Sequence, residues 1–165
     1  MCWVKSRAPG TLINPPFFAG TGWKVVTGLK EGQTQSDTPS CSNSCIWAHP
    51  IDIHLHTKGL QDWPKLLFEV HQVDKYGRSE LAGYGFCNIP SSPGLHNLVV
   101  PTWRPRGSAR DRFRQFFLGG STQLTEPNLV CTSEDRYQLS TESMGNVLLE
   151  LGIVLRNFKN QGVEI

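Results

Sequence analysis

Apolar and polar residues alternate along much of this chain, a pattern typical of β-strands that bury one face. For example, Ile51, Ile53 and Leu55 alternate with polar residues over positions 51–56. Loops rich in Gly, Pro, Ser and Asn separate such stretches. The pattern predicts strands at 23–26, 31–35, 51–56, 65–73, 80–90, 95–100, 129–139 and 146–158. We therefore expect an all-β protein, an antiparallel β-sandwich of about seven or eight strands.

Two of these stretches have the clearest apolar faces. Side chains two positions apart project from the same side of a strand. In the predicted strand 65–73, this places Leu66, Phe68 and Val70 on one side. In the stretch 146–158 the shared side is formed by Val147, Leu149, Leu151, Ile153 and Leu155. Both sets are predicted to lie in the core. Pro101 is expected to end the strand before it, because proline cannot donate to a sheet ladder.

One helix is predicted, near residues 107–118. Ser108 can cap its start, Asp111 follows at the spacing of a capping box, and a pair of glycines ends it. Phe113 falls on one helical face together with Phe116 and Phe117. The stretch that includes this helix is strongly basic: Asp111 is its single acidic residue, and its five arginines are Arg104, Arg106, Arg110, Arg112 and Arg114. The helix could bind a membrane surface or a partner, or it could lay its phenylalanines on the sandwich and solvate its arginines.

Composition narrows the class of protein. The 165 residues include 16 Gly and 11 Pro, which suits one β-domain with frequent turns. A net charge of +2 is too small to indicate a nucleic-acid partner. The chain has neither the apolar run of about 18 residues that a membrane span needs nor the apolar core of a signal peptide. A cytoplasmic protein is expected.

The histidines offer a candidate metal site. His54 and His56 project from one face of the predicted strand, with Asp52 on the same face. Three ligands on alternate positions of one strand spread too far along it for a single ion, so a solvated polar face is the simpler interpretation. The chain also lacks a G-x-S-x-G nucleophile motif, a P-loop and a dinucleotide-binding motif. We expect no metal, no cofactor and no enzyme activity.

The loop after residue 73 has two interpretations. Asp74, in the stretch Asp-Lys-Tyr-Gly-Arg, could be half of a calcium site together with Asp37 of the loop at 36–44. Calcium takes about six to eight oxygen ligands, and the loop sets positive charge beside Asp74. We therefore expect Asp74 to start a turn by binding its own backbone, with Gly77 at positive φ.

Several stretches resemble the B9 domain family. They are "GLKEGQTQSDTP", "WAHPIDIHLHTKGLQDWPKLLFEVHQVDKYGRSELAGYGFCNIPSSPG", "PTWRPRGS" and the closing "LGIVLRNFKNQGVEI". The pieces HPID, TKGLQ-WP, GR-x-x-LAGYGF and PTWRP occur in this order. The resemblance covers residues 23–165 and implies a divergent C2 β-sandwich. It also implies a non-enzymatic component of the tectonic-like, Meckel-syndrome-linked complex at the ciliary transition zone, near the basal body and associated with the cytoskeleton.

That resemblance sets further expectations. It implies partners among other B9-domain proteins and members of the transition-zone complex, and a role in cilium assembly and in the diffusion barrier between ciliary and plasma membrane. Relatives open with a short alternating strand that residues 1–22 do not match. This N-terminal segment is expected to be poorly ordered or to replace the first strand, ahead of a domain at 23–165.

Two sets of side chains are candidates for binding. Interface hot spots favour Trp and Arg, and the candidates for partner binding are Trp63, Trp103, Arg104 and Arg106, although Trp103 could equally belong to the core. The alternative function is a peripheral module that binds anionic lipid without calcium. The lipid-facing candidates are Lys75, Arg78, Arg110, Arg112 and Arg114.

Overall fold

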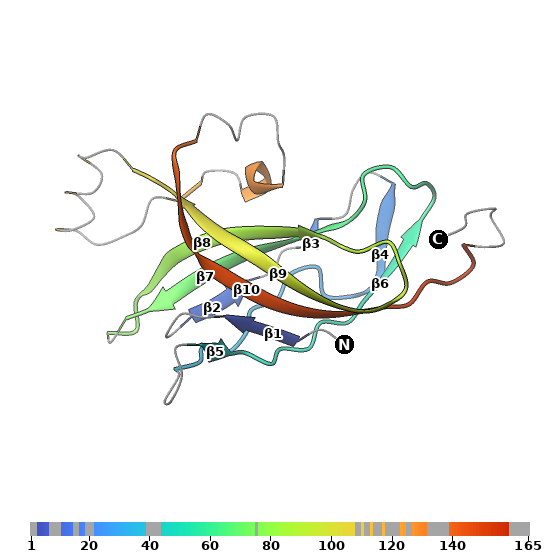
Figure 1. The fold of residues 1–165 in the computed structure, drawn as a ribbon, viewed down its shortest axis with the longest axis horizontal. Helices are drawn as coiled ribbons and strands as arrows, with labels where there is room; N and C mark the ends of the chain where they lie inside the picture. Colours follow the sequence, from blue (N-terminus) through green and yellow to red (C-terminus); the bar gives the residue numbers. More distant parts are fainter. Residues whose placement is uncertain are drawn as a thin grey trace.

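The computed structural model describes residues 3–6, 11–14, 17–18, 22–38, 44–74, 76–107, 110, 113, 117, 123–124, 127–131 and 139–158. For 3–6, 11–14, 17–18 and 127–128 it describes the backbone alone. The elements are β1 (Trp3–Ser6), β2 (Thr11–Asn14), β3 (Phe17–Phe18), β4 (Trp23–Gly28), β5 (Cys45–Ile46), β6 (Ile53–Thr57), β7 (Lys65–Val73), β8 (Ser79–Asn88), β9 (Gly94–Pro105), the 3₁₀ helix η1 (Pro127–Val130) and β10 (Thr141–Ile153) (Figure 1).

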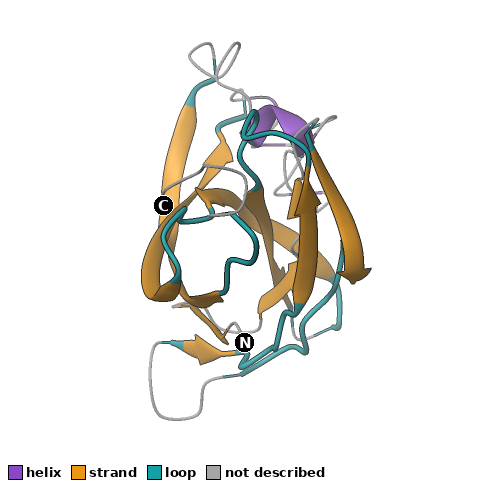
Figure 2. Cartoon of the chain, turned by 90° about the vertical axis from the view of Figure 1, so that its right-hand side faces the viewer, coloured by secondary structure: helices purple, strands orange, loops and turns teal. Residues whose placement is uncertain are grey.

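The strands form two antiparallel sheets. Eight belong to one sheet in the order β2-β7-β8-β9-β10-β1-β5, with β3 also paired to β7, and β4 and β6 form a separate ribbon. Strands β7 and β10 lie three places apart in this order and still share one core, so the large sheet bends around its apolar face. The end-on view of Figure 2 shows strands on opposite sides of the middle of the molecule. The expected all-β, antiparallel fold is confirmed.

Most predicted strands are present, with changed ends. Strand β7 has the predicted bounds, whereas β9 continues through Pro101 to Pro105. Pro101 keeps its place opposite Asn146 of β10 and does not end the strand. A bulge between Ser143 and Gly145 follows on β10, and β9 pairs with β8 at the single position Tyr84–Trp103. A missing N–H costs little where the ladder is interrupted.

Two expected strands differ in the structure. Residues 31–35 form no strand, and the segment predicted as a strand from residue 129 begins inside η1, while residues 132–138 lie outside the described residues. Within residues 1–22, for which the sequence predicted no strand, β1 pairs with β10 and β5, while β2 and β3 pair with β7. A short strand needs little periodicity of its own where a neighbouring strand supplies the hydrogen bonds. The domain division at residue 22 stays a prediction.

Each face of the large sheet carries its own apolar cluster. The predicted face of β7 is confirmed, and that of β10 is confirmed for Val147, Leu149 and Leu151 but not for Ile153 and Leu155, which are only partly buried. The inner cluster, which also includes side chains of β5 and β9, contains Cys45, Trp47, Leu66, Phe68, Val70, Val100, Val147, Leu149 and Leu151. On the other face of β7 and β8 lies the outer cluster, formed by Leu67, Leu81, Tyr84, Trp103, Val130 and Cys131. The segment around η1 therefore covers only part of the outer face.

The predicted helix is present where it can be described. Arg110, Phe113 and Phe117 are helical, while Ser108, Asp111, Arg112, Arg114 and Phe116 lie outside the described residues. Within the described part of the chain, no helix has the length and apolarity to cross a membrane.

Candidate interaction surfaces

The loop between β7 and β8 is a turn organised by Asp74. Its Oδ1 accepts hydrogen bonds from the backbone N–H groups of Tyr76 (2.8 Å) and Arg78 (2.9 Å), and its Oδ2 accepts from Arg78 Nε at 2.8 Å. Gly77 has φ of 78°. Chiefly because of the backbone bond from Arg78, the pKa of Asp74 lies below its usual value of 3.8. The predicted turn is confirmed; Lys75 lies outside the described residues.

The carboxylates proposed for calcium are engaged in local structure. Both oxygens of Asp74 accept bonds from its own loop, and Asp37 Oδ2 accepts the backbone N–H of Ile46 at 2.7 Å. Among the described residues, no group of three or more His, Cys, Asp or Glu side chains could hold a metal ion. These aspartates therefore fix turns and strand ends.

Within the described residues, the histidines belong to no group of three or more side chains that could hold a metal ion. His54 and His56 are exposed on β6, and His54 Nε2 lies 3.7 Å from Asp52 Oδ1. His71 Nε2 lies 3.6 Å from Glu69 Oε2, on the outer face of β7. His54 and His71 thus each lie near a single carboxylate, and His56 is a polar surface residue.

The two tryptophans that are candidates for partner binding both make contacts within the fold. Trp63 is half-buried, donates from Nε1 to the Ile89 carbonyl at 2.6 Å, and meets the Trp23 ring edge-on with centroids 4.9 Å apart. Trp103 is 8% exposed in the outer cluster, with its ring centroid 6.0 Å from that of Tyr84. Trp103 therefore occupies the core position that the sequence left open. Partner binding by either residue stays a prediction.

The candidate arginines lie near the end of β9. Arg104 pairs through Nε with Glu142 Oε1, which stands opposite it on β10. Arg106 has an exposed side chain, and its backbone N–H donates to the Ser140 carbonyl at 2.7 Å. Arg110 and Arg78 are also exposed, and the Arg78 guanidinium stacks over the Tyr76 ring, 5.4 Å from its centroid.

The described phenylalanines of the helix are largely exposed. Phe113 is 70% exposed and Phe117 is 78% exposed. Arg110 precedes Phe113 by three positions and Phe117 by seven, so all three share one helical face. A Phe face laid on the sandwich, one of the two alternatives for this helix, is therefore not found for these two residues.

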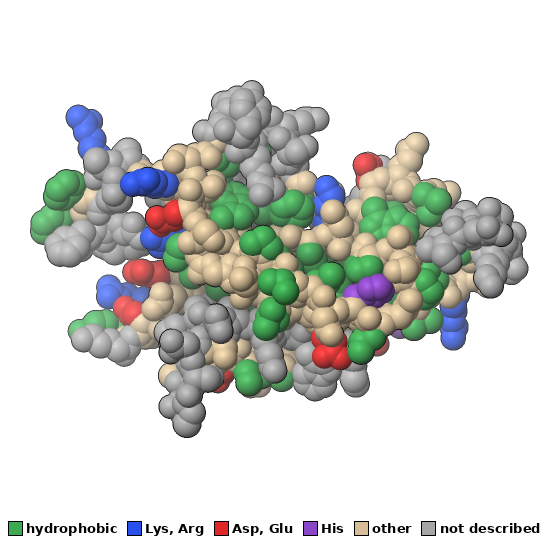
Figure 3. Space-filling view, viewed as in Figure 1, with side chains coloured by type: hydrophobic (Ala, Val, Ile, Leu, Met, Phe, Trp, Pro, Cys, Tyr) green, Lys and Arg blue, Asp and Glu red, His purple; other side chains and the backbone are tan. Residues whose placement is uncertain are grey.

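Sequence reasoning missed an apolar surface on strands β9 and β10. Val99 is 62% exposed and lies opposite Leu148, which is 46% exposed; Leu95, farther along β9, is 66% exposed. We call these three residues the β9–β10 face. Figure 3 shows hydrophobic side chains gathered where these strands cross the front of the molecule. The signal was present in the unbroken apolar runs LVV and VLL, which make both faces of each strand apolar.

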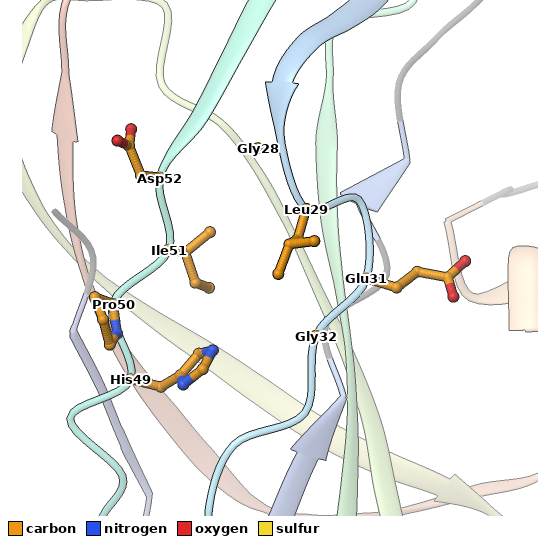
Figure 4. A pocket seen from close by; sticks show the side chains of 8 residues that line it. All are labelled: Gly28, Leu29, Glu31, Gly32, His49, Pro50, Ile51 and Asp52. Atoms are coloured by element: carbon orange, nitrogen blue, oxygen red, sulfur yellow. The ribbon is translucent and has the colours of Figure 1, made fainter.

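A small hollow lies between the end of β4 and the segment before β6. Its volume is about 170 Å³, and its lining includes Leu29, His49 and Ile51. In Figure 4 the Leu29 and Ile51 side chains point toward each other, whereas the carboxylates of Glu31 and Asp52 point away. This hollow can hold a small apolar group, and it brings no set of acid, base and nucleophile together.

These features define an antiparallel β-sandwich protein with exposed apolar and aromatic side chains on its described surface. The family model described as "Ciliary basal body-associated, B9 protein" matches residues 9–154. The chain therefore belongs to the B9 domain family and is a ciliary B9 protein, which confirms the resemblance and the basal-body association that it implied.

Individual relatives agree with this assignment. The chain is 52% identical to B9 domain-containing protein 2 of Homo sapiens over 145 residues, which cover 88% of this chain and 83% of that protein. It is 39% identical to B9 domain-containing protein 2 of Drosophila melanogaster, with the same coverage. Identity to B9 domain-containing protein 1 of Xenopus laevis is 28%, covering 88% of this chain and 75% of that protein.

Proposed function

We propose that this protein is a non-enzymatic scaffold of the tectonic-like, Meckel-syndrome-linked complex at the ciliary transition zone. There it supports cilium assembly and the diffusion barrier between the ciliary and plasma membranes, and it binds other B9-domain proteins. Its membership of a family of ciliary B9 proteins supports this role.

The β9–β10 face is the observation that carries the binding part of this proposal. Val99 and Leu148 are directly opposite in the ladder, so their side chains form one continuous apolar area rather than two isolated contacts. Apolar side chains at the centre of a sheet face gain free energy when a partner removes them from water, by about 25 cal/mol per Å². An exposed apolar sheet face of this kind can pack against the sheet of another β-sandwich.

Binding of B9 domain-containing protein 1 tests the proposal. The double variant Val99→Ser/Leu148→Ser should lower affinity for that purified protein by at least about tenfold, because two aliphatic anchors are lost. The matched control is Val26→Ser on β4, since Val26 is 61% exposed and Val99 is 62% exposed. Isothermal titration measures each affinity.

Two results would contradict the proposal. One is the absence of binding by the unchanged protein. The other is equal affinity for the double variant and the Val26→Ser control, which would place the contact elsewhere. Thermal unfolding of each variant, followed by circular dichroism, shows whether the fold is kept.

A further inference from the structure

Strand β9 has a free edge along most of its length. It pairs with β10 from Gly94 to Pro105, but on its other side it pairs with β8 only at Trp103 (Figure 1). Within the part of the chain that the structure describes, no further backbone-to-backbone hydrogen bond involves residues 94–102. We call residues 94–100 the β9 edge. A free edge of this length can pair with a strand of another molecule.

The backbone groups of β9 that point to the free side can be assigned. Arg106, directly after β9, donates its N–H at 2.7 Å to the carbonyl of the residue that precedes β10. Successive residues of an antiparallel ladder direct their N–H and C=O groups alternately to either side, so even-numbered residues of β9 face β10. Pro101 and Pro105, which have no N–H to donate to β10, both occupy odd positions. The residues of the β9 edge whose N–H and C=O groups point to the free side are therefore Leu95, Asn97 and Val99.

The sequence of the β9 edge is symmetric in residue type about Asn97. When two copies are aligned antiparallel with Asn97 opposite Asn97, Leu95 of each copy meets Val99 of the other. Both side chains are exposed, and apolar pairs across a ladder stabilise it. The chain has a proline before the edge, at 93, and another after it, at 101. These prolines meet in the same alignment and limit the pairing to residues 94–100.

The β9 edge carries no permanent charge. Residues 93–101 contain no Lys, Arg, Asp or Glu. Many proteins place charges on an edge strand to keep other strands away. Without such charges, two copies of this edge do not repel each other, and an uncovered edge could pair with strands indiscriminately. A contact about a two-fold axis covers the edge of both copies with the same residues and then closes.

We propose that the partner of the β9 edge is a second copy of this chain, paired antiparallel about a two-fold axis at Asn97. Leu95, Asn97 and Val99 of the two copies then exchange backbone hydrogen bonds, so that the two large sheets form one continuous sheet. This dimer does not depend on the scaffold role. Its formation leaves the β9–β10 face open, because strands that join edge to edge do not cover the faces of a sheet.

Sedimentation velocity of the purified chain over a range of concentrations tests for this dimer. The unchanged protein should dimerise as its concentration rises. Asn97→Lys places two like charges opposite each other at the axis, so self-association should weaken at least about tenfold at low salt. Asn97→Glu should have the same effect. An equimolar mixture of the two variants should form a heterodimer, because the charges across the axis are then opposite.

The matched control is Asn146→Lys. Asn146 is also exposed, and it lies on β10 opposite Pro101, one strand away from the free edge. This variant should dimerise as the unchanged protein does. Asn97→Lys should keep its affinity for B9 domain-containing protein 1, because the β9–β10 face is unchanged. That result separates the dimer from the scaffold proposal.

Hydrogen exchange provides a measurement that needs no variant. Residues 94–100 of the unchanged protein should exchange more slowly as its concentration rises, whereas β6 should show no such change. Circular dichroism of each variant shows whether the fold is kept.

Three results would exclude this dimer. They are an unchanged protein that stays monomeric at every concentration, an Asn97→Lys variant that dimerises as tightly as the unchanged protein, and a mixture of the Lys and Glu variants that forms no heterodimer. If the unchanged protein stays monomeric and Asn97→Lys loses B9 domain-containing protein 1, the β9 edge pairs with a strand of that protein instead.

Discussion

At the scale of single residues, Asp74 determines the conformation of the β7–β8 turn. Its two oxygens accept three hydrogen bonds from the loop, and Gly77 supplies the positive φ. The same residue was the candidate calcium ligand. A carboxylate that already satisfies its own backbone has less capacity for an ion that needs about six to eight oxygens.

Replacing Asp74 by Asn should lower stability near neutral pH. The pKa of Asp74 is lowered in the folded state, so its contribution is present above the usual value of 3.8 and is lost as pH falls through the lowered pKa. The difference between the unchanged protein and Asp74→Asn should therefore shrink in acid. Urea unfolding at a series of pH values measures it. Asp52→Asn is the control, because the Asp52 side chain is 87% exposed. A pH-independent difference would refute the linkage.

Residue type alone left the role of Trp103 open. A tryptophan suits an interface hot spot and a core equally well. Its burial depends on Val130 and Cys131, which η1 brings over the sheet from about 27 positions along the chain. The residues next to Trp103 in the sequence do not indicate that Val130 and Cys131 will cover it.

At the scale of elements, the ribbon of β4 and β6 depends on one close approach. Gly28 has φ of 102°, and an added Cβ there would lie 2.4 Å from the Asp52 carbonyl oxygen. Residues with a side chain rarely adopt this positive φ. The clashing oxygen belongs to the backbone of Asp52, so moving it would distort the chain and cost free energy. Gly28 thus allows β4 to end against the strand that follows Asp52.

Gly28→Ala should destabilise the protein by about 1–3 kcal/mol, from backbone strain and the clash together. Gly59→Ala is the control, because an added Cβ at Gly59 meets no atom within 4 Å. Denaturant unfolding followed by circular dichroism compares the two variants. Equal stability of both would mean that the approach at Gly28 is not required.

Strand β10 shows what periodicity can and cannot reveal. The alternation of Val147, Leu149 and Leu151 predicted the inner face, and all three are buried there. Leu148 sits between them on the opposite face and is 46% exposed. The period identifies two faces, but the partner of the second face depends on which other chain segments or molecules reach it.

At the scale of the whole molecule, Trp63 connects the ribbon to the large sheet. Its Nε1 donates to Ile89, which directly follows β8, and its ring meets Trp23 of β4. The backbone of Ile89 also donates to the Pro64 carbonyl at 3.2 Å. This tryptophan therefore fixes the position of the ribbon against the end of β8.

Trp63→Ala should loosen the ribbon and leave the large sheet intact. Hydrogen exchange followed by mass spectrometry should show faster exchange at residues 53–57 of β6, while β7 and β10 keep their protection. Leu60→Ala is the control from the same connector, since Leu60 is 47% exposed. Unchanged exchange in β6 would show that the ribbon is held by other contacts.

The sequence by itself determined most of the longer strands and the part of the inner core that β7 and β10 supply. Alternation is a local property of the chain, and the faces of β7 and β10 followed from it, as did the turn at Asp74. The tertiary structure alone decided that Trp103 is covered, that Phe113 and Phe117 are exposed, and that the β9–β10 face is bare. Exposure depends on whether a distant segment such as η1 packs over a side chain, and neighbours in the sequence do not specify that contact.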